Sequence, residues 1–265
     1  MISRPFIILA LSVSAANAQL DLGTGDVPQS EVDAYLEPFY QVIASGLGQG
    51  RFAPGRNGGG FEIGFQAGMV PLPDREAFET TTLSSLPFFR ARAGGHWAGA
   101  AVMARGMAWS DPRMGDLSAF GAAASWGRDL PLPMAIPIRA DLDAGWDRFD
   151  FSSEYTYRYR GSALGLFDQD IPGDYTLSEQ VLGGGLTVSA RLGKWTPYFR
   201  GGFDWASGRF AYLYLDPRDD KTRRVHSDLA FPVVRGAVGL FWRGLRAEAS
   251  FGPYTALEAG WSFFH

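Results

Sequence analysis

The chain is 265 residues long, has a formal net charge of −4 and contains no cysteine. Because no basic excess is available to neutralise phosphates, the composition argues against a nucleic-acid partner. No run after position 18 approaches the roughly 20 consecutive apolar residues of a membrane-spanning helix, which excludes insertion through helices. The 34 glycines and 14% aromatic residues are typical of curved strands with aromatic girdles.

The first 18 residues predict an export signal. Arg4 lies near the start, an apolar run extends from Phe6 to Val13, and Ala16-Asn17-Ala18 has the small-x-small pattern of a cleavage site. The apolar run is too short to span a membrane as a helix. We therefore expect residues 1–18 to be a cleaved signal peptide and the mature chain to be exported to a Gram-negative periplasm.

Residues 19–59 predict a short amphipathic helix and a glycine-rich linker. Ser30-Glu31-Val32-Asp33 resembles a helix-opening capping box. The apolar side chains fall near one helical face; they are Val32, Tyr35, Leu36, Phe39, Val42 and Ile43. Pro38 should kink this helix or mark where it begins in earnest, and the glycines at 46, 48 and 50 should end it. Its polar face carries carboxylates and not lysine or arginine, so we expect a periplasmic helix beneath or partly within the structure that follows.

From residue 60 onward, apolar and polar residues alternate along ten segments, which is typical of strands with two different faces. The clearest is 136–147, where alternate positions hold arginine and aspartate. The others are 61–69, 89–93, 99–109, 116–127, 182–192, 198–205, 234–242, 245–251 and 257–263. Lipid requires one apolar face and a lumen tolerates charge on the other. The pattern therefore predicts an all-β fold over residues 60–265, a transmembrane antiparallel up-and-down β-barrel of about ten strands, within a range of about 8–12.

The connections between these segments alternate in length. Those at roughly 72–86, 150–177 and 209–229 are long, whereas those at 94–98, 128–133, 193–195 and 242–244 are short. The connection at 110–115 is intermediate, and the one around 252–253 is tight although it falls on the long side. Outer-membrane barrels have short periplasmic turns and longer external loops. The alternation therefore favours an outer-membrane location, with the tyrosine-rich stretch 155–159 free to add a hairpin above the membrane.

The end of the chain resembles the terminal strand of bacterial outer-membrane barrels. Apolar residues alternate from Leu257 to Phe263 and an aromatic Phe264 follows, although His265 places that aromatic one position before the end. In that family the barrel-assembly machinery reads this strand. The resemblance therefore implies two partners, this machinery and outer-membrane lipid.

The start of the mature chain resembles a second family. The segments 35–39, 46–52 and 60–65 are similar to the opening of exported barrels of unknown function, which begin with a short helix and a glycine-rich stretch. This resemblance implies an architecture and no chemistry.

Charged residues of both signs fall on the inward face of the predicted strands. This lumen network comprises Glu62, Arg90, Arg92, Arg105, Arg139, Asp141, Asp143, Asp147, Arg191, Arg200, Asp204, Arg235, Arg246, Glu248 and Glu258. Ten strands leave a packed or very narrow interior. The network therefore predicts either a structural salt-bridge system that closes the barrel or a narrow pore whose unpaired arginines select small polar or anionic solutes.

Five tryptophans are expected at the membrane interfaces. In a soluble barrel the polar residues would face outward and the apolar ones inward, which would bury too much aromatic volume near the strand ends. The five tryptophans are Trp126, Trp146, Trp205, Trp242 and Trp261.

An enzyme and a ligand-binding barrel are the alternatives. The best cluster for a lipid or peptide hydrolase lies in the predicted long loop and comprises His226, Asp216, Asp219, Asp220 and Ser227. Such a stretch is more often a solvated charged loop, and no metal-ligand spacing is met. The glycine runs at 58–60 and 183–185 are not phosphate loops, so we predict no cofactor and no metal. A ligand-binding barrel would use its external loops.

Overall fold

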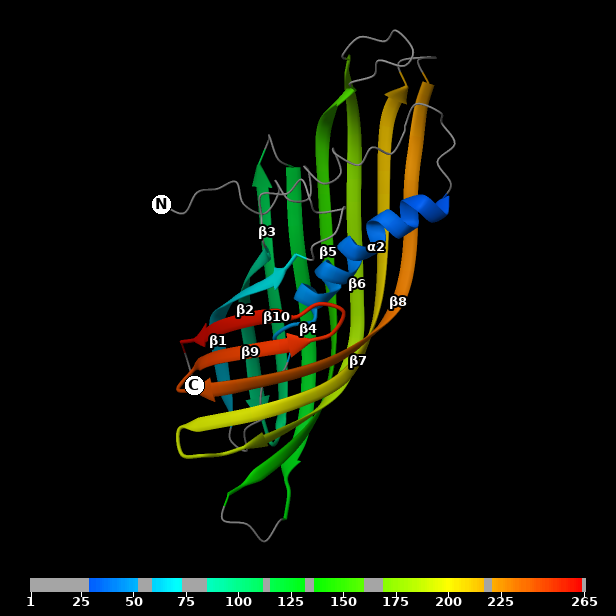
Figure 1. The fold of residues 1–265 in the computed structure, drawn as a ribbon. Helices are drawn as coiled ribbons and strands as arrows, with labels where there is room; N and C mark the ends of the chain where they lie inside the picture. The colour runs from blue at the N-terminus through cyan, green and yellow to red at the C-terminus, as the bar shows by residue number, and fades with distance from the viewer. Residues whose placement is uncertain are drawn as a thin grey trace.

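The structure is a computed structural model, and it describes residues 29–51, 59–72, 85–111, 115–131, 136–159, 169–216 and 221–263. Its strands are β1 (Gly60–Pro71), β2 (Ser85–Trp97), β3 (Ala100–Asp111), β4 (Gly115–Asp129), β5 (Ile138–Tyr159), β6 (Gln169–Ala190), β7 (Trp195–Asp216), β8 (Lys221–Trp242), β9 (Leu245–Phe251) and β10 (Ala256–Ser262). They form a closed antiparallel barrel in which β1 pairs with β10 (Figure 1). The predicted all-β, ten-stranded up-and-down barrel is confirmed.

The strands differ in length, which gives the barrel a high side and a low side. β5 to β8 have 22 residues each, whereas β9 and β10 have 7 each. Tight turns at 98–99, 193–194 and 243–244 lie at one end, which we call the short-turn end. At the other end β5 to β8 rise well beyond β1, β9 and β10 (Figure 1). A tilted strand needs only about 9–11 residues to cross a bilayer, so the long strands continue past such a layer.

Outward-facing apolar side chains form a belt around the short-turn half of the barrel. On β5 this apolar belt covers 138–146, and on β6, β7 and β8 it covers 182–190, 195–205 and 232–242. Its exposed members include Phe61, Phe65, Phe89, Val102, Phe120, Leu142, Leu182, Phe199, Val234 and Leu257. Soluble monomers rarely expose so large a continuous apolar surface, whereas hydrocarbon requires one.

Above the belt the polarity of the wall inverts while the side-chain alternation continues. On β5, the charged Asp147 faces inward and the apolar Trp146 faces outward. Two residues later the polarity is reversed, because the apolar Phe149 faces inward and the charged Arg148 faces outward. Apart from Glu179 and Ser227, the inner faces of β6 to β8 are apolar at the same height, with Leu177, Val181, Phe210, Tyr212, Val225, Leu229 and Phe231. We call this part, residues 148–159, 169–181, 206–216 and 221–231, the upper wall.

Two connections that were expected to be long loops, 150–177 and 209–229, are mostly strand. Antiparallel pairing continues up to Tyr159↔Gln169 and Asp216↔Lys221. The expectation was wrong because it assumed a single polarity for each strand. With water outside and apolar packing inside, the upper wall needs the opposite alternation.

The apolar lining of the upper wall packs against α2 (Gln29–Leu47), which runs along the inside of the barrel (Figure 1). The buried stripe of the helix comprises Val32, Leu36, Phe39, Tyr40, Val42, Ile43 and Leu47. Gly208 on β7 permits this contact, because a Cβ there would lie 2.2 Å from the Tyr40 ring. Within the described ranges, no helix is long and apolar enough to cross a membrane.

The helix enters at the upper wall and ends near the middle of the barrel. Near its start, the Ser227 hydroxyl of β8 donates a hydrogen bond to Asp33 (2.6 Å). Near its end, Arg235 donates to the carbonyls of Ala44 and Ser45 (3.0 and 2.9 Å). Since Arg235 lies further along β8 toward the short-turn end, α2 descends into the lumen.

The structure bears on two expectations for this segment. Of the two positions expected for the helix, beneath the barrel or partly within it, the structure has the second, because the buried stripe of the helix packs against the inner face of the wall. The helix is also continuous through Pro38 and does not begin there. An interior proline costs about 3 kcal/mol, and the buried side chains on both sides, Leu36 and Tyr40, hold the helix together across it. It ends where expected, at Leu47, before a turn in which Gly50 has φ +66°.

Candidate functional site

The C-terminus of α2 is held by three arginines of the barrel wall. An α-helix leaves its last four carbonyls without intrahelical partners. Arg235 donates to Ala44 and Ser45, Arg90 to Gly46 (2.7 Å) and Leu47 (3.2 Å), and Arg105 to Leu47 (2.5 Å). We call Arg90, Arg105 and Arg235 the arginine clamp. Cations are also favoured here because the helix dipole places partial negative charge at this end.

Two aspartates fix the clamp and bind a fourth arginine from the chain just after the helix. Arg51 donates to Asp147 of β5 (2.6 Å) and to Asp204 of β7 (2.7 Å). Asp147 also accepts from Arg105 (2.9 Å), and Asp204 accepts from Arg235 (2.9 Å). These side chains are almost completely buried. The helix carbonyls supply the acceptors that two carboxylates alone cannot provide for four guanidinium groups.

A second group binds the turn at Gly50. Glu248 accepts from the Gly50 N–H (3.1 Å) and from Tyr198 (2.5 Å), and Arg246 donates to the Gly50 carbonyl (3.0 Å). Arg246 also pairs with Glu248 and with Glu258. Gly50 cannot carry a side chain, because its φ is +66° and a Cβ would lie 2.3 Å from Glu258.

The remaining lumen pairs lie on the wall itself. Arg200 donates to both carboxylate oxygens of Asp143, and Arg139 does the same to Asp141. Arg139 also donates to the carbonyls of Gly99 and Gly127. Arg92 pairs with Glu62. The lumen is therefore a set of matched ion pairs closed around the end of a helix.

The structure brings together all the predicted lumen residues except Arg191. The inward-facing members are Glu62, Arg90, Arg92, Arg105, Arg139, Asp141, Asp143, Asp147, Arg200, Asp204, Arg235, Arg246, Glu248 and Glu258. Arg191 is a correction: β6 ends at Ala190, so the alternation no longer directs this side chain inward, and it is exposed.

The predicted interfacial tryptophans face outward at two heights. Trp126 and Trp261 are exposed near the short-turn end, where Trp242 stacks on Trp195 with ring centroids 5.3 Å apart. Trp146 and Trp205 are exposed at the border between the belt and the upper wall. Both sets fit the rims of an apolar layer.

Glu179 of β6 is a buried carboxylate that the sequence analysis missed. It is fully buried, and neither oxygen has a hydrogen-bond partner among the described residues. It pairs in register with Gly208, against which the Tyr40 ring packs, and with Phe149 of the upper wall, so it lies above the apolar belt. Burial raises the pKa of the Glu179 carboxyl well above its ordinary value of 4.5.

The hydrolase cluster does not assemble on the residues that are described. Ser227 is buried and bonded to Asp33, whereas His226 is exposed on the opposite face of β8. Asp228 forms an exposed pair with Arg209 (2.7 Å). Asp219 and Asp220 lie outside the described residues, as does the side chain of Asp216. Within the described part of the chain, no group of His, Asp or Glu side chains could hold a metal ion.

No family model matches the chain, and no curated protein matches it. Similar solved structures include the following three, all at low identity. The outer membrane protease OmpT from Escherichia coli is 11% identical, with a TM-score of 0.39 over 78% of this chain and 93% of its own. The transport unit of the autotransporter AIDA-I from Escherichia coli is 9% identical, with a TM-score of 0.26 over 89% of this chain and 98% of its own. The beta domain of the Bordetella autotransporter BrkA is 11% identical, with a TM-score of 0.18 over 78% and 99%. These likenesses extend to the barrel fold alone.

Asp147→Asn should destabilise the barrel by about 3–5 kcal/mol, because it leaves Arg51 and Arg105 buried without their shared carboxylate. The measurement is urea unfolding of the refolded protein in phospholipid vesicles, followed by tryptophan fluorescence. Asp150→Asn is the matched control on the same strand. It removes only an exposed pair with Arg148 and should cost about 0–1 kcal/mol. Equal losses of unfolding free energy in the two variants would show that the buried ion pairs of Asp147 stabilise the barrel no more than the exposed pair of Asp150 does.

Glu179→Gln should change how stability depends on pH. The folded state keeps the Glu179 proton at pH values where the unfolded chain has lost it, so this group lowers wild-type stability as pH rises above about 4.5, by up to about 1.4 kcal/mol per pH unit. The unfolding free energy of Glu179→Gln relative to wild type should therefore increase from pH 5 to pH 9. Glu154→Gln, at an exposed position of β5, should show no such trend. A flat difference for Glu179→Gln would mean that Glu179 is ionised in the folded protein.

Proposed function

We propose that this protein is a structural β-barrel of a Gram-negative outer membrane, exported by a cleaved signal peptide, whose lumen is kept closed by its own helix α2. The arginine clamp carries the proposal. An open arginine-lined pore would need guanidinium groups that face solvent. The described lumen arginines instead bind carboxylates and the carbonyls that end α2.

The apolar belt supports the membrane location. On β5 to β8 it covers 138–146, 182–190, 195–205 and 232–242, which are the strand lengths that cross a hydrocarbon layer, and tryptophans lie at both of its borders. We place the short-turn end in the periplasm and the upper wall outside, since periplasmic turns are the short ones. The exposed apolar residues of β10, including Leu257 and Trp261, suit recognition by the barrel-assembly machinery, which we propose as a partner together with outer-membrane lipid.

The alternative functions have less support. A narrow solute pore would have to pass the clamp, and a hydrolase would need Ser227 and His226 on one face of β8. A ligand-binding role for the external surface agrees with the height of the upper wall. The similar solved structures give this role no support. We therefore favour the closed structural barrel.

The closed state is tested by planar-bilayer conductance of the mature chain. Wild type should show no steady current. The double variant Arg105→Ala/Arg235→Ala should conduct at least tenfold more, because the last carbonyls of α2 lose their partners. Arg148→Ala, in an exposed pair of the upper wall, is the control and should stay silent.

Heat-dependent gel mobility would show that each variant is a folded barrel. A steady wild-type current that changes from anion to cation preference in Arg139→Glu/Arg200→Glu would replace the closed barrel with the narrow pore.

The proposed orientation puts the start of α2 on the cell surface. Because the chain has no cysteine, single cysteines can report it. Ser30→Cys, exposed at the start of α2, should react in intact cells with a bulky polyethylene-glycol maleimide. Lys194→Cys, in a tight turn at the short-turn end, should react only after the outer membrane is permeabilised. The opposite pattern would reverse the orientation.

A further inference from the structure

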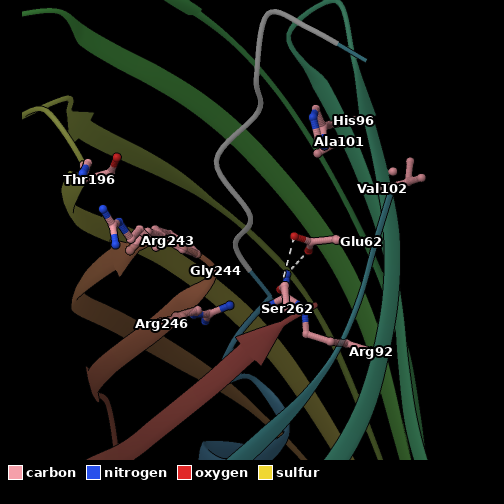
Figure 2. Close-up of a pocket in the computed structure, with 13 residues that line it drawn as sticks. Glu62, Arg92, His96, Ala101, Val102, Thr196, Arg243, Gly244, Arg246 and Ser262 are labelled. Carbon is pink, nitrogen blue, oxygen red and sulfur yellow. Dashed lines mark hydrogen bonds and ion pairs between the residues drawn. The ribbon is translucent and has the colours of Figure 1, made fainter. Parts of the chain in front are cut away.

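A cavity of about 100 Å³ opens inside the barrel at the short-turn end, below the clamp. The start of β1 and the end of β2 lie on one side of it. The start of β7, the end of β8 and the start of β9 lie on the other (Figure 2). Arg243, Arg246 and Thr196 line one side, and Glu62 and Arg92 line the other. The lining is polar on both sides, unlike the outward-facing apolar belt.

The cavity has an excess of positive charge. Four of its side chains are cationic, Arg92, Lys194, Arg243 and Arg246, and only Glu62 is anionic. Glu248 and Glu258 offset the charge of Arg246 from outside the cavity. The charges of Lys194 and Arg243, both exposed on the tight turns at the rim, add to the excess.

Arg92 provides the second observation. It is only 3% exposed and binds Glu62 through one terminal nitrogen, while its Nε has no hydrogen-bond partner among the described residues. A buried guanidinium N–H without an acceptor is costly and points to an acceptor supplied from outside the chain. Arg92 lines the cavity, so an oxyanion bound there would lie beside this guanidinium group.

We propose that this cavity binds one small oxyanion of the size of inorganic phosphate. Lys194 and Arg243 would attract the anion, and Arg92 would donate to its oxygens. The volume admits a tetrahedral anion. The proposal that an anion binds here rests on the cavity alone. The further statement that the site faces the periplasm, and is a dead end below α2, rests on the proposed function.

The test is isothermal titration of inorganic phosphate into the refolded full-length mature protein in detergent, at constant ionic strength. Wild type should bind one phosphate with a Kd below about 1 mM, which corresponds to about −4 kcal/mol. Sulfate should compete, and chloride should not. Lys194→Ala/Arg243→Ala changes only exposed side chains and should weaken binding at least tenfold, whereas Arg148→Ala on the upper wall should leave it unchanged.

Glu62→Gln distinguishes a binding site from general attraction to a positive surface. Glu62 accepts from Arg92 and from the Ser262 hydroxyl (3.4 Å), and it is the anionic group of the cavity. Removing its charge should strengthen phosphate binding several-fold. No binding by wild type, equal binding by Lys194→Ala/Arg243→Ala, or weaker binding by folded Glu62→Gln would each overturn the proposal. None of these results depends on whether the barrel conducts, so this proposal and the closed barrel can fail separately.

Discussion

The rest of the structure depends on the contact between the clamp and the end of α2. The wall places Arg90, Arg105 and Arg235 at the same height. Together with Arg51 these arginines carry more positive charge than the two neighbouring aspartates, Asp147 and Asp204, can neutralise. A buried cation without an acceptor is strongly destabilising. The helix brings the missing acceptors, since its last carbonyls have no partners of their own. Wall and helix are therefore incomplete separately, and each satisfies the polar groups that the other leaves open.

This complementarity explains the inversion of polarity along the long strands. Where the outside is apolar, the inside carries the charges that bind the end of α2 and the turn after it. Where the outside becomes polar, from Arg148 upward on β5, the inside becomes apolar and packs on the body of the helix. One helix thus needs two linings, an apolar one for its side chains and a cationic one for its C-terminus. The change from Asp147 to Phe149 on β5 marks the border between them.

Strand alternation was enough to predict the closed barrel, its ten strands and the inward direction of residues such as Asp143 and Arg200, because those properties follow from period-two patterning and from the demands of lipid. The height of β5 to β8 could not be predicted from a single polarity. Arg51 was missed because it lies in an irregular segment, where no periodicity says which way a side chain points. Glu179 was missed because it lies in the part of β6 that precedes the predicted segment 182–192, where no strand was expected. Its lack of a partner depends in addition on a helix that local sequence does not place.

The ion network sets the position of α2 more than it adds stability. Buried ion pairs often contribute little compared with apolar packing of the same volume, because desolvation offsets their attraction. The cost of misplacing them is nevertheless large. A slip of α2 by one turn would move its end by about 5.4 Å, which would take the carbonyls of Ala44 and Leu47 out of reach of Arg235 and Arg105. Apolar packing along the upper wall would tolerate such a slip far better, since hydrophobic contacts are not directional. The charged lumen therefore selects one depth for a helix that the apolar wall alone would hold at several.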